Sequence, residues 1–297
     1  MKLLLQILWG WSVLANGAVG IQVGTIQTNN QNIKLMKFNY NNPAWLQGAS
    51  NVGGGVEHLT FTCDTIGSKS FWISGEGLVK ITYQEDGVYK TTELDSPDYE
   101  MVNLNMDQHS NVTVSGVIKT FSNFDRGSGV LIRNIDLTSC ASLESLTLHT
   151  TFLYSALDLS KNTKLKVLTL DSYKFDTLDL SANTLLNKFY VNNAQNLPLL
   201  SLDTCPLLND LTLSDVPQLA SLDIRYNEQI TSIYLANLGR LTSITAFVGS
   251  EAFANSLAEQ FANLNEYGVI FINRDGEYNQ IVESAASDRT WSIQYYD

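Results

Sequence analysis

The sequence predicts a mainly β protein built around a short solenoid of about five coils, each 21–22 residues long, with a β-sandwich before it and an α/β cap after it. Three observations predict this fold. A four-residue phrase returns at a fixed interval from residue 135 onward, and a second apolar triplet lies between its successive copies. Residues 56–124 alternate apolar and polar side chains in short runs bounded by turn residues.

The repeated phrase starts at residues 135, 157, 178, 200 and 222, so successive starts are 22, 21, 22 and 22 residues apart. Its copies are Ile135-Asp136-Leu137-Thr138, Leu157-Asp158-Leu159-Ser160, Leu178-Asp179-Leu180-Ser181, Leu200-Ser201-Leu202-Asp203 and Leu222-Asp223-Ile224-Arg225. The second triplets are Leu146-Thr147-Leu148, Leu168-Thr169-Leu170, Phe189-Tyr190-Val191, Leu211-Thr212-Leu213 and Ile233-Tyr234-Leu235. Each places two apolar side chains on one face of an extended segment, and only stacked coils bury that face.

The spacing Leu165-x-x-Leu168-x-Leu170, with four equivalents in register, matches the leucine-rich-repeat pattern. Residues 157–163 and 178–184 resemble the short leucine-rich repeats of Bacteroidetes-type surface proteins. The resemblance implies a non-enzymatic binding or structural role at a cell or virion surface, and it does not specify a ligand.

Four parts follow from this reading: an apolar segment and extended arm over 1–55, a sandwich over 56–130, the solenoid over 131–250 and a cap over 251–297. Residues 1–20 have the lysine, apolar run and small residues of a secretory signal. The alternative is that this segment is retained and packs against a partner. Residues 21–55 read as an arm with one or two short strands and a Gly53–Gly55 linker.

The strands expected between 56 and 124 are 56–63, 70–74, 78–83, 89–94, 100–105 and 111–118. Turn residues Gly75-Glu76-Gly77 and Glu85-Asp86-Gly87 separate several of them. The order of strands and turns resembles the PKD-like immunoglobulin-fold modules of bacterial surface proteins. Those modules read Trp-Gly-Asp-Gly at the turn where this chain has Glu85-Asp86-Gly87.

The last part departs from the repeat. Phe253, Leu257, Phe261 and Leu264 lie on one face of a helix, and 269–273, 280–287 and 290–296 read as strand, helix and strand. An amphipathic piece of this kind is suited to cover the last coil. The ending resembles the cap that follows such repeats in bacteriophage tail and fibre proteins, with Thr290-Trp291-Ser292-Ile293 in place of Gly-Trp-Thr-Val.

The net charge and the cysteines exclude some classes of partner and some kinds of site. The net charge of −12 argues against nucleic acid and anionic membranes as partners. Cys140 and Cys205 share one repeat position three coils apart, about 15 Å at ~4.8 Å per coil, which is too far for a disulfide. With Cys63 they form no C-x-x-C pair, and we interpret Cys140 and Cys205 as small buried hydrophobes.

No catalytic, metal or cofactor motif is present in the sequence, so we expect no enzyme activity and no cofactor. His58, His109 and His149 are far apart and are interpreted as surface residues. Asp136, Asp158, Asp179 and Asp223 form a column that we interpret as solvated, because the partner acids that a cation needs are missing.

The expected binding surface is the outward side of the triplet strands, called the sheet face below. Its residues are Ser145, Thr147, His149, Val167, Thr169, Asp171, Lys188, Tyr190, Asn192, Asp210, Thr212, Ser214, Ser232, Tyr234 and Ala236. The candidate binding residues among them are His149, Asp171, Lys188, Tyr190, Asn192, Asp210 and Tyr234. The alternatives are that this face is merely solvated or packs on a sister subunit.

These observations favour a non-enzymatic virion-associated phage protein of the tail, fibre or capsid decoration. Its arm (residues 1–55) would anchor it to other virion proteins, and its sheet face would bind a host protein or glycan. The alternative is a secreted bacterial cell-surface adhesion protein with a cleaved signal. A third class, a glycan hydrolase, needs two acids converging in a cleft. A homo-oligomer is compatible with each reading.

Overall fold

The structure is a computed structural model that describes residues 56–64, 66–123, 129–149, 156–172, 174 and 176–297, together with the backbone of three strands nearer the N-terminus. The chain divides into two compact units, Met1–Val56 and Glu57–Asp297. In the first unit, β1 (Ile7–Trp9) and β3 (Gln31–Lys37) each pair antiparallel with β2 (Gln22–Thr28). The rest of the predicted signal and the Gly53–Gly55 linker lie outside the described residues.

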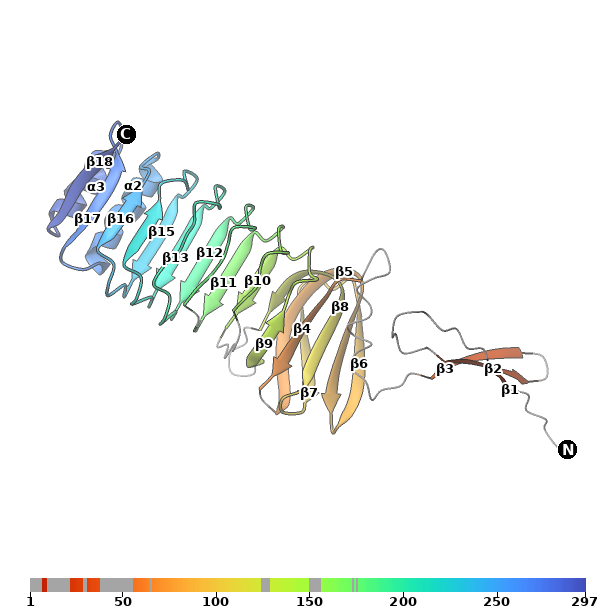
Figure 1. Ribbon diagram of the computed structural model, residues 1–297. Helices are drawn as coiled ribbons and strands as arrows, with labels where there is room; N and C mark the ends of the chain where they lie inside the picture. Colours follow the sequence, from red (N-terminus) through yellow and green to blue (C-terminus); the bar gives the residue numbers. More distant parts are fainter. Residues whose placement is uncertain are drawn as a thin grey trace. The chain divides into compact units, whose positions relative to one another are not determined.

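The second unit begins with six strands, most of which were predicted (Figure 1). They are β4 (His58–Cys63), β5 (Gly67–Glu85), β6 (Val88–Asp95), β7 (Glu100–Met106), β8 (Asn111–Ser122) and β9 (Ile132–Asp136). β5 pairs with β7 along its first half, with β6 along its second half and with β8 along both. Phe61, Phe71 and Phe121 pack at the centre, with ring centroids 5.5–5.6 Å apart.

The prediction of two separate strands over 70–74 and 78–83 is wrong, because both belong to β5. Gly75-Glu76-Gly77 is not a turn between strands but an irregular point within one strand, where the register with β8 shifts. A Cβ atom at Gly75 would lie 2.4 Å from the carbonyl oxygen of Val117, and Gly116, which precedes Val117 in β8, has a φ of +133°. The two glycines therefore allow the backbones of β5 and β8 to approach closely where the register changes.

The apolar triplets form parallel strands, as the repeat predicted (Figure 1). They are β10 (Ser145–Leu148), β11 (Val167–Asp171), β12 (Lys188–Asn192), β13 (Asp210–Ser214) and β15 (Ser232–Ala236). Leu146, Leu168, Phe189 and Leu211 lie in register and are fully buried. These apolar columns hold one coil against the next, since each buried side chain removes apolar surface from water.

The strands of the predicted sandwich and the repeat strands belong to one sheet, which the sequence did not predict. β8 pairs in parallel with β10, with Phe121 opposite Leu146 and Ser122 opposite Thr147. β9, which contains the first two residues of the first repeat phrase, pairs antiparallel with β4. The first coil is therefore covered by a strand of the preceding region, and the domain boundary at 130 stays a prediction.

A ladder of side chains runs inside the coils at the position that Cys140 and Cys205 share. Its members are Cys140, Asn162, Asn183, Cys205 and Asn227, all of which are buried. Asn162 Nδ2 donates to the carbonyl oxygens of Leu137 (3.1 Å) and Cys140 (2.8 Å), and the other two asparagines repeat this pattern. Each amide thus adds a second hydrogen bond to two carbonyls of the coil before it, which also accept from backbone amides of their own coil. The burial of both cysteines was predicted, but the asparagines of the ladder were not.

The last part has the predicted helices and strands. A second sheet has the order β14 (Ser221–Ile224), β16 (Ser243–Ala246), β17 (Gly268–Asn273) and β18 (Trp291–Tyr296). The helices are α2 (Glu251–Gln260), the 3-10 helix η2 (Phe261–Asn263) and α3 (Asn279–Ser287). Ser250 caps α2 by accepting from the backbone of Phe253 at 3.2 Å, and the four predicted apolar residues of the helical face are buried.

Candidate functional site

The sheet face lies on one side of β10, β11, β12, β13 and β15, and its central row is in register. Thr147, Thr169, Tyr190, Thr212 and Tyr234 occupy this row. The apolar neighbours of each row residue are buried, whereas the row residues themselves are partly or largely exposed. The backbone ladder sets the spacing of these side chains at ~4.8 Å per strand.

The side chains of three candidate binding residues are connected in one polar network. His149 Nε2 lies 2.5 Å from Asp171 Oδ2, and Asn192 Nδ2 donates to Asp171 Oδ1 at 2.9 Å. The backbone of His149 is held by Asn123, whose Oδ1 accepts from the amide at 2.6 Å and whose Nδ2 donates to the carbonyl at 2.8 Å. Asn123 follows β8, so this polar network begins where the predicted sandwich strands meet the repeat strands.

His149 was interpreted as a surface residue, and its side chain is about one third exposed (36%) but paired with Asp171. His109 is also paired: its Nδ1 lies 3.0 Å from Asp64 Oδ1, and its φ is +61°. His58 lies on β4. The three histidines therefore lie in separate places, as their spacing in the sequence suggested.

A second pair lies one strand further along. Tyr190 Oη donates to Asp210 Oδ2 at 2.6 Å, and burial, followed by this bond to a carboxylate, raises the pKa of Tyr190 to about 12. Lys188 is exposed, and it lies opposite Asp210 in the register of β12 and β13. Tyr234 is about half exposed (49%) and lies two strands from Tyr190, roughly 10 Å away at the spacing of a sheet.

A polar row at the end of these strands was not predicted. Ser172, Asn193, Asp215 and Asn237 each follow a strand of the sheet face and have φ between 54° and 59°. Asn193 Nδ2 donates to Ser172 Oγ (3.2 Å), and Asn237 Nδ2 donates to Asp215 Oδ1 (2.9 Å). Asn and Asp tolerate the left-handed conformation better than most residues. Their recurrence every 21–22 residues is the signal that would have identified this row.

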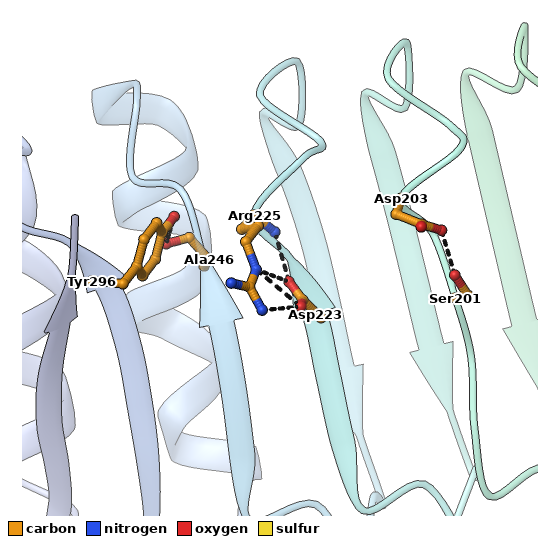
Figure 2. Close-up of polar contacts among 6 residues, drawn as sticks. All are labelled: Ser201, Asp203, Asp223, Arg225, Ala246 and Tyr296. Atoms are coloured by element: carbon orange, nitrogen blue, oxygen red, sulfur yellow. Dashed lines mark hydrogen bonds and ion pairs between the residues drawn. The ribbon is translucent and has the colours of Figure 1, made fainter.

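On the opposite side of the coils, the aspartate column stabilises turns. Asp136, Asp158 and Asp179 each accept from the backbone amide two residues later at 2.9 Å, and Asp223 does so at 3.2 Å. In the coil between those of Asp179 and Asp223, the serine precedes the aspartate, and Ser201 Oγ donates to Asp203 (Figure 2). The hydrogen bonds from Ser160 and Ser181 lower the pKa values of Asp158 and Asp179. The carboxylates thus have a local structural role.

Arg225 extends this column into the second sheet. Its Nε donates to both oxygens of Asp223 at 3.0 Å, and Nη2 donates to Oδ2 at 2.6 Å (Figure 2). The guanidinium carbon also lies 5.6 Å from the ring centroid of Tyr226 and 5.7 Å from that of Tyr296. The hydrogen bond from Arg225 is the main reason that the pKa of Asp223 is lowered.

Within the ranges given above, no group of three or more His, Cys, Asp or Glu side chains is arranged to hold a metal ion. Cys63, Cys140 and Cys205 are buried, and burial raises the pKa of the Cys140 thiol to about 12. The exposed groups of the sheet face offer hydrogen bonds and aromatic surface. No helix in the described part of the chain has the length and apolarity to span a bilayer.

Comparison with known proteins shows a distant likeness among solved structures. No protein-family model matches the chain, and no curated protein matches it. Among solved structures, the chain is similar to the functional domain of InlJ from Listeria monocytogenes, described as including a cysteine ladder, at 20% identity and a TM-score of 0.37. The match covers 52% of this chain and 37% of the InlJ chain. These comparisons do not support the resemblances to PKD-like modules and to Bacteroidetes-type proteins.

Proposed function

We propose that this chain is a non-enzymatic binding protein that presents the sheet face to a protein or a glycan. The observation that carries the proposal is that one continuous face bears all seven candidate binding residues. They are His149, Asp171, Lys188, Tyr190, Asn192, Asp210 and Tyr234.

The physical support is rigidity combined with exposed aromatic surface. Buried leucines and the inner asparagine ladder fix the strands, so residues such as Tyr190 and Tyr234 lose little further freedom when a ligand binds. Tyrosine provides a large contact area with few rotatable bonds and is enriched where binding energy is concentrated. The polar network adds hydrogen-bonding groups at one side of the same face, from His149, Asp171 and Asn192.

The finer assignment is also a proposal. We infer a leucine-rich-repeat solenoid of about five coils over 131–250, a PKD-like sandwich over 56–130 and a cap over 251–297. The preferred setting is a virion, with 1–55 contacting other virion proteins. The alternative is a secreted bacterial adhesion protein with a cleaved signal, and in either setting the sheet face would contact a host or partner surface.

Binding is tested by applying the labelled full chain to an array of bacterial surface glycans and to intact bacterial cells. The test variant is Tyr190→Ala with Tyr234→Ala, and the matched control is Tyr226→Ala, an exposed tyrosine on the opposite side of the coils. We expect the double variant to lose at least tenfold in affinity, about 1.4 kcal/mol or more, and the control to bind normally. Undiminished binding by the double variant would contradict the proposal.

Two further measurements separate the alternatives. Incubating the protein with any glycan that it binds and analysing the products by mass spectrometry tests the non-enzymatic assignment, which cleavage would overturn. Intact mass with N-terminal sequencing of protein from its native source tests the setting. A chain that begins at Met1 favours the virion, and a chain that begins near Ile21 favours secretion.

A further inference from the structure

Four edge strands of the second unit are protected against further pairing, in two different ways. An edge strand has backbone groups that pair with another strand unless something prevents it. In the main sheet, α2 covers the edge of β15 through two side chains. Ser256 Oγ accepts from the amide of Ile233 at 2.9 Å and donates to its carbonyl at 3.1 Å. Gln260 Oε1 accepts from the amide of Leu235 at 3.0 Å.

Three other edge strands carry charges. Among the described strands, β6 and β7 pair only with β5, and β9 pairs only with β4. β6 contains Lys90, Glu93 and Asp95, β7 contains Glu100, and β9 contains Arg133 and Asp136. Charged side chains on an edge disfavour pairing with a further strand, because the charges would be desolvated.

β18 has neither form of protection. It is the outermost strand of the second sheet and, among the described strands, pairs only with β17 (Figure 1). Its sequence, Trp-Ser-Ile-Gln-Tyr-Tyr, contains no charged residue, no proline and no glycine. It is rich in residues that favour strands. At the other end of this sheet, the coil that holds Ser201 and Asp203 runs beside β14 (Figure 2).

The backbone direction shows which groups of β18 are available. The amide of Arg274 donates to the carbonyl of Tyr296 at 3.0 Å, so the backbone of Tyr296 faces β17. Because backbone groups alternate in direction along a strand, those of Trp291, Ile293 and Tyr295 face the open edge. Ile293 is partly buried against the core, and Tyr295 is 44% exposed with its Oη bonded to Glu283 at 2.8 Å.

We propose that β18 is a dimerisation edge, on which two copies of this chain pair antiparallel about a two-fold axis at Ile293. This register places Ile293 opposite Ile293 of the partner subunit and Trp291 opposite Tyr295 of the partner subunit. β-branched and aromatic residues are favourable cross-strand pairs, and no like charges face each other within the strand. The three residues with open-edge backbone groups are symmetric about Ile293, which matches the self-complementarity of a two-fold interface.

The first test is sedimentation velocity of the full chain over about a hundredfold range of concentration, since association follows mass action. We expect a concentration-dependent species of twice the mass of the chain. A wild-type chain that stays monomeric over the whole range overturns the proposal. This test is independent of the ligand of the sheet face.

The second test uses Tyr295→Pro. Proline removes the amide that faces the open edge without removing a hydrogen bond to β17, and its φ fits a strand. The matched control, Tyr295→Thr, loses the same ring and the same bond to Glu283 but keeps the amide. We expect the proline variant to be monomeric and the threonine variant to dimerise. A dimeric, folded proline variant overturns the proposal.

If the proline variant fails to fold, hydrogen exchange of the wild-type chain tests whether β18 pairs in a dimer. We expect the amides of Trp291, Ile293 and Tyr295 to become more protected as concentration rises. The charged edge strand β6 (Val88–Asp95) is the internal control and should not change. Equal behaviour of the two strands at all concentrations overturns the proposal.

Discussion

Two polar ladders run along the coils, one buried and one exposed, and both bond to the backbone. The inner ladder holds Asn162, Asn183 and Asn227, whose amides donate to carbonyls of the preceding coil. The outer column holds Asp158 and Asp179, whose carboxylates accept from amides of their own turn. The inner bonds join coils and are shielded from water, whereas the outer bonds are local and compete with water. Burial, and not the number of hydrogen bonds, should therefore decide which ladder carries the stability.

The largest expected effect comes from breaking the inner ladder at its centre. Asn183→Ala removes the side-chain donor to the carbonyls of Leu159 and Asn162, which keep only their backbone donors, and opens a small cavity. We expect a loss of about 2–4 kcal/mol in the free energy of unfolding, measured by denaturant titration. Asn183→Cys, which places the residue of positions 140 and 205 there, is the control and should cost less. Equal stability of the alanine variant and the wild type would refute the assigned role.

The ladder can also be strengthened. Cys205 Sγ makes a long contact to the carbonyl of Asn183 at 3.8 Å. An asparagine at this position would donate to the carbonyls of Leu180 and Asn183 in the pattern of the other coils. We expect Cys205→Asn to raise the free energy of unfolding by about 1 kcal/mol, measured by denaturant titration. A destabilised variant would indicate that this coil is packed differently from its neighbours.

The exposed column should respond weakly. Asp179→Ala removes the acceptor for the amide of Ser181, but water can replace it. We expect a loss of stability clearly smaller than that of Asn183→Ala in the same coil, measured by thermal unfolding under identical conditions. A loss as large as that of the inner variant would contradict the difference drawn between the two ladders.

The smallest expected effect is on the pH dependence of the melting temperature below about pH 4. Hydrogen bonds from Ser160 and Ser181 lower the pKa values of Asp158 and Asp179 in the folded chain. Their contribution is present above the unfolded pKa of about 3.9 and is lost as pH falls through the lowered folded pKa. Replacing both by Asn keeps an acceptor that does not titrate, so the melting temperature should fall less steeply below about pH 4. Melting curves at several pH values test this, and identical slopes for variant and wild type count against it.

Much of the fold could be predicted because its signals are local or periodic. The triplet around Thr169 and the helical face of Phe253 and Leu257 follow from spacing alone. The candidate residues of the sheet face could be predicted for the same reason, since alternation decides which side chains point outward. Their partners could not be predicted: whether His149 meets Asp171, or Tyr190 meets Asp210, depends on rotamers across neighbouring strands.

The sequence alone determined the repeat, because a 21–22-residue period with inward leucines has one economical solution, a stack of parallel coils. The continuation of this stack by β8, the unbroken course of β5 past Gly75 and the covering of β15 by α2 became visible only in the folded chain. The physical reason is that backbone groups pair with any strand of suitable direction. Which strand they meet is therefore decided by the packing of the whole chain and not by the residues of either strand.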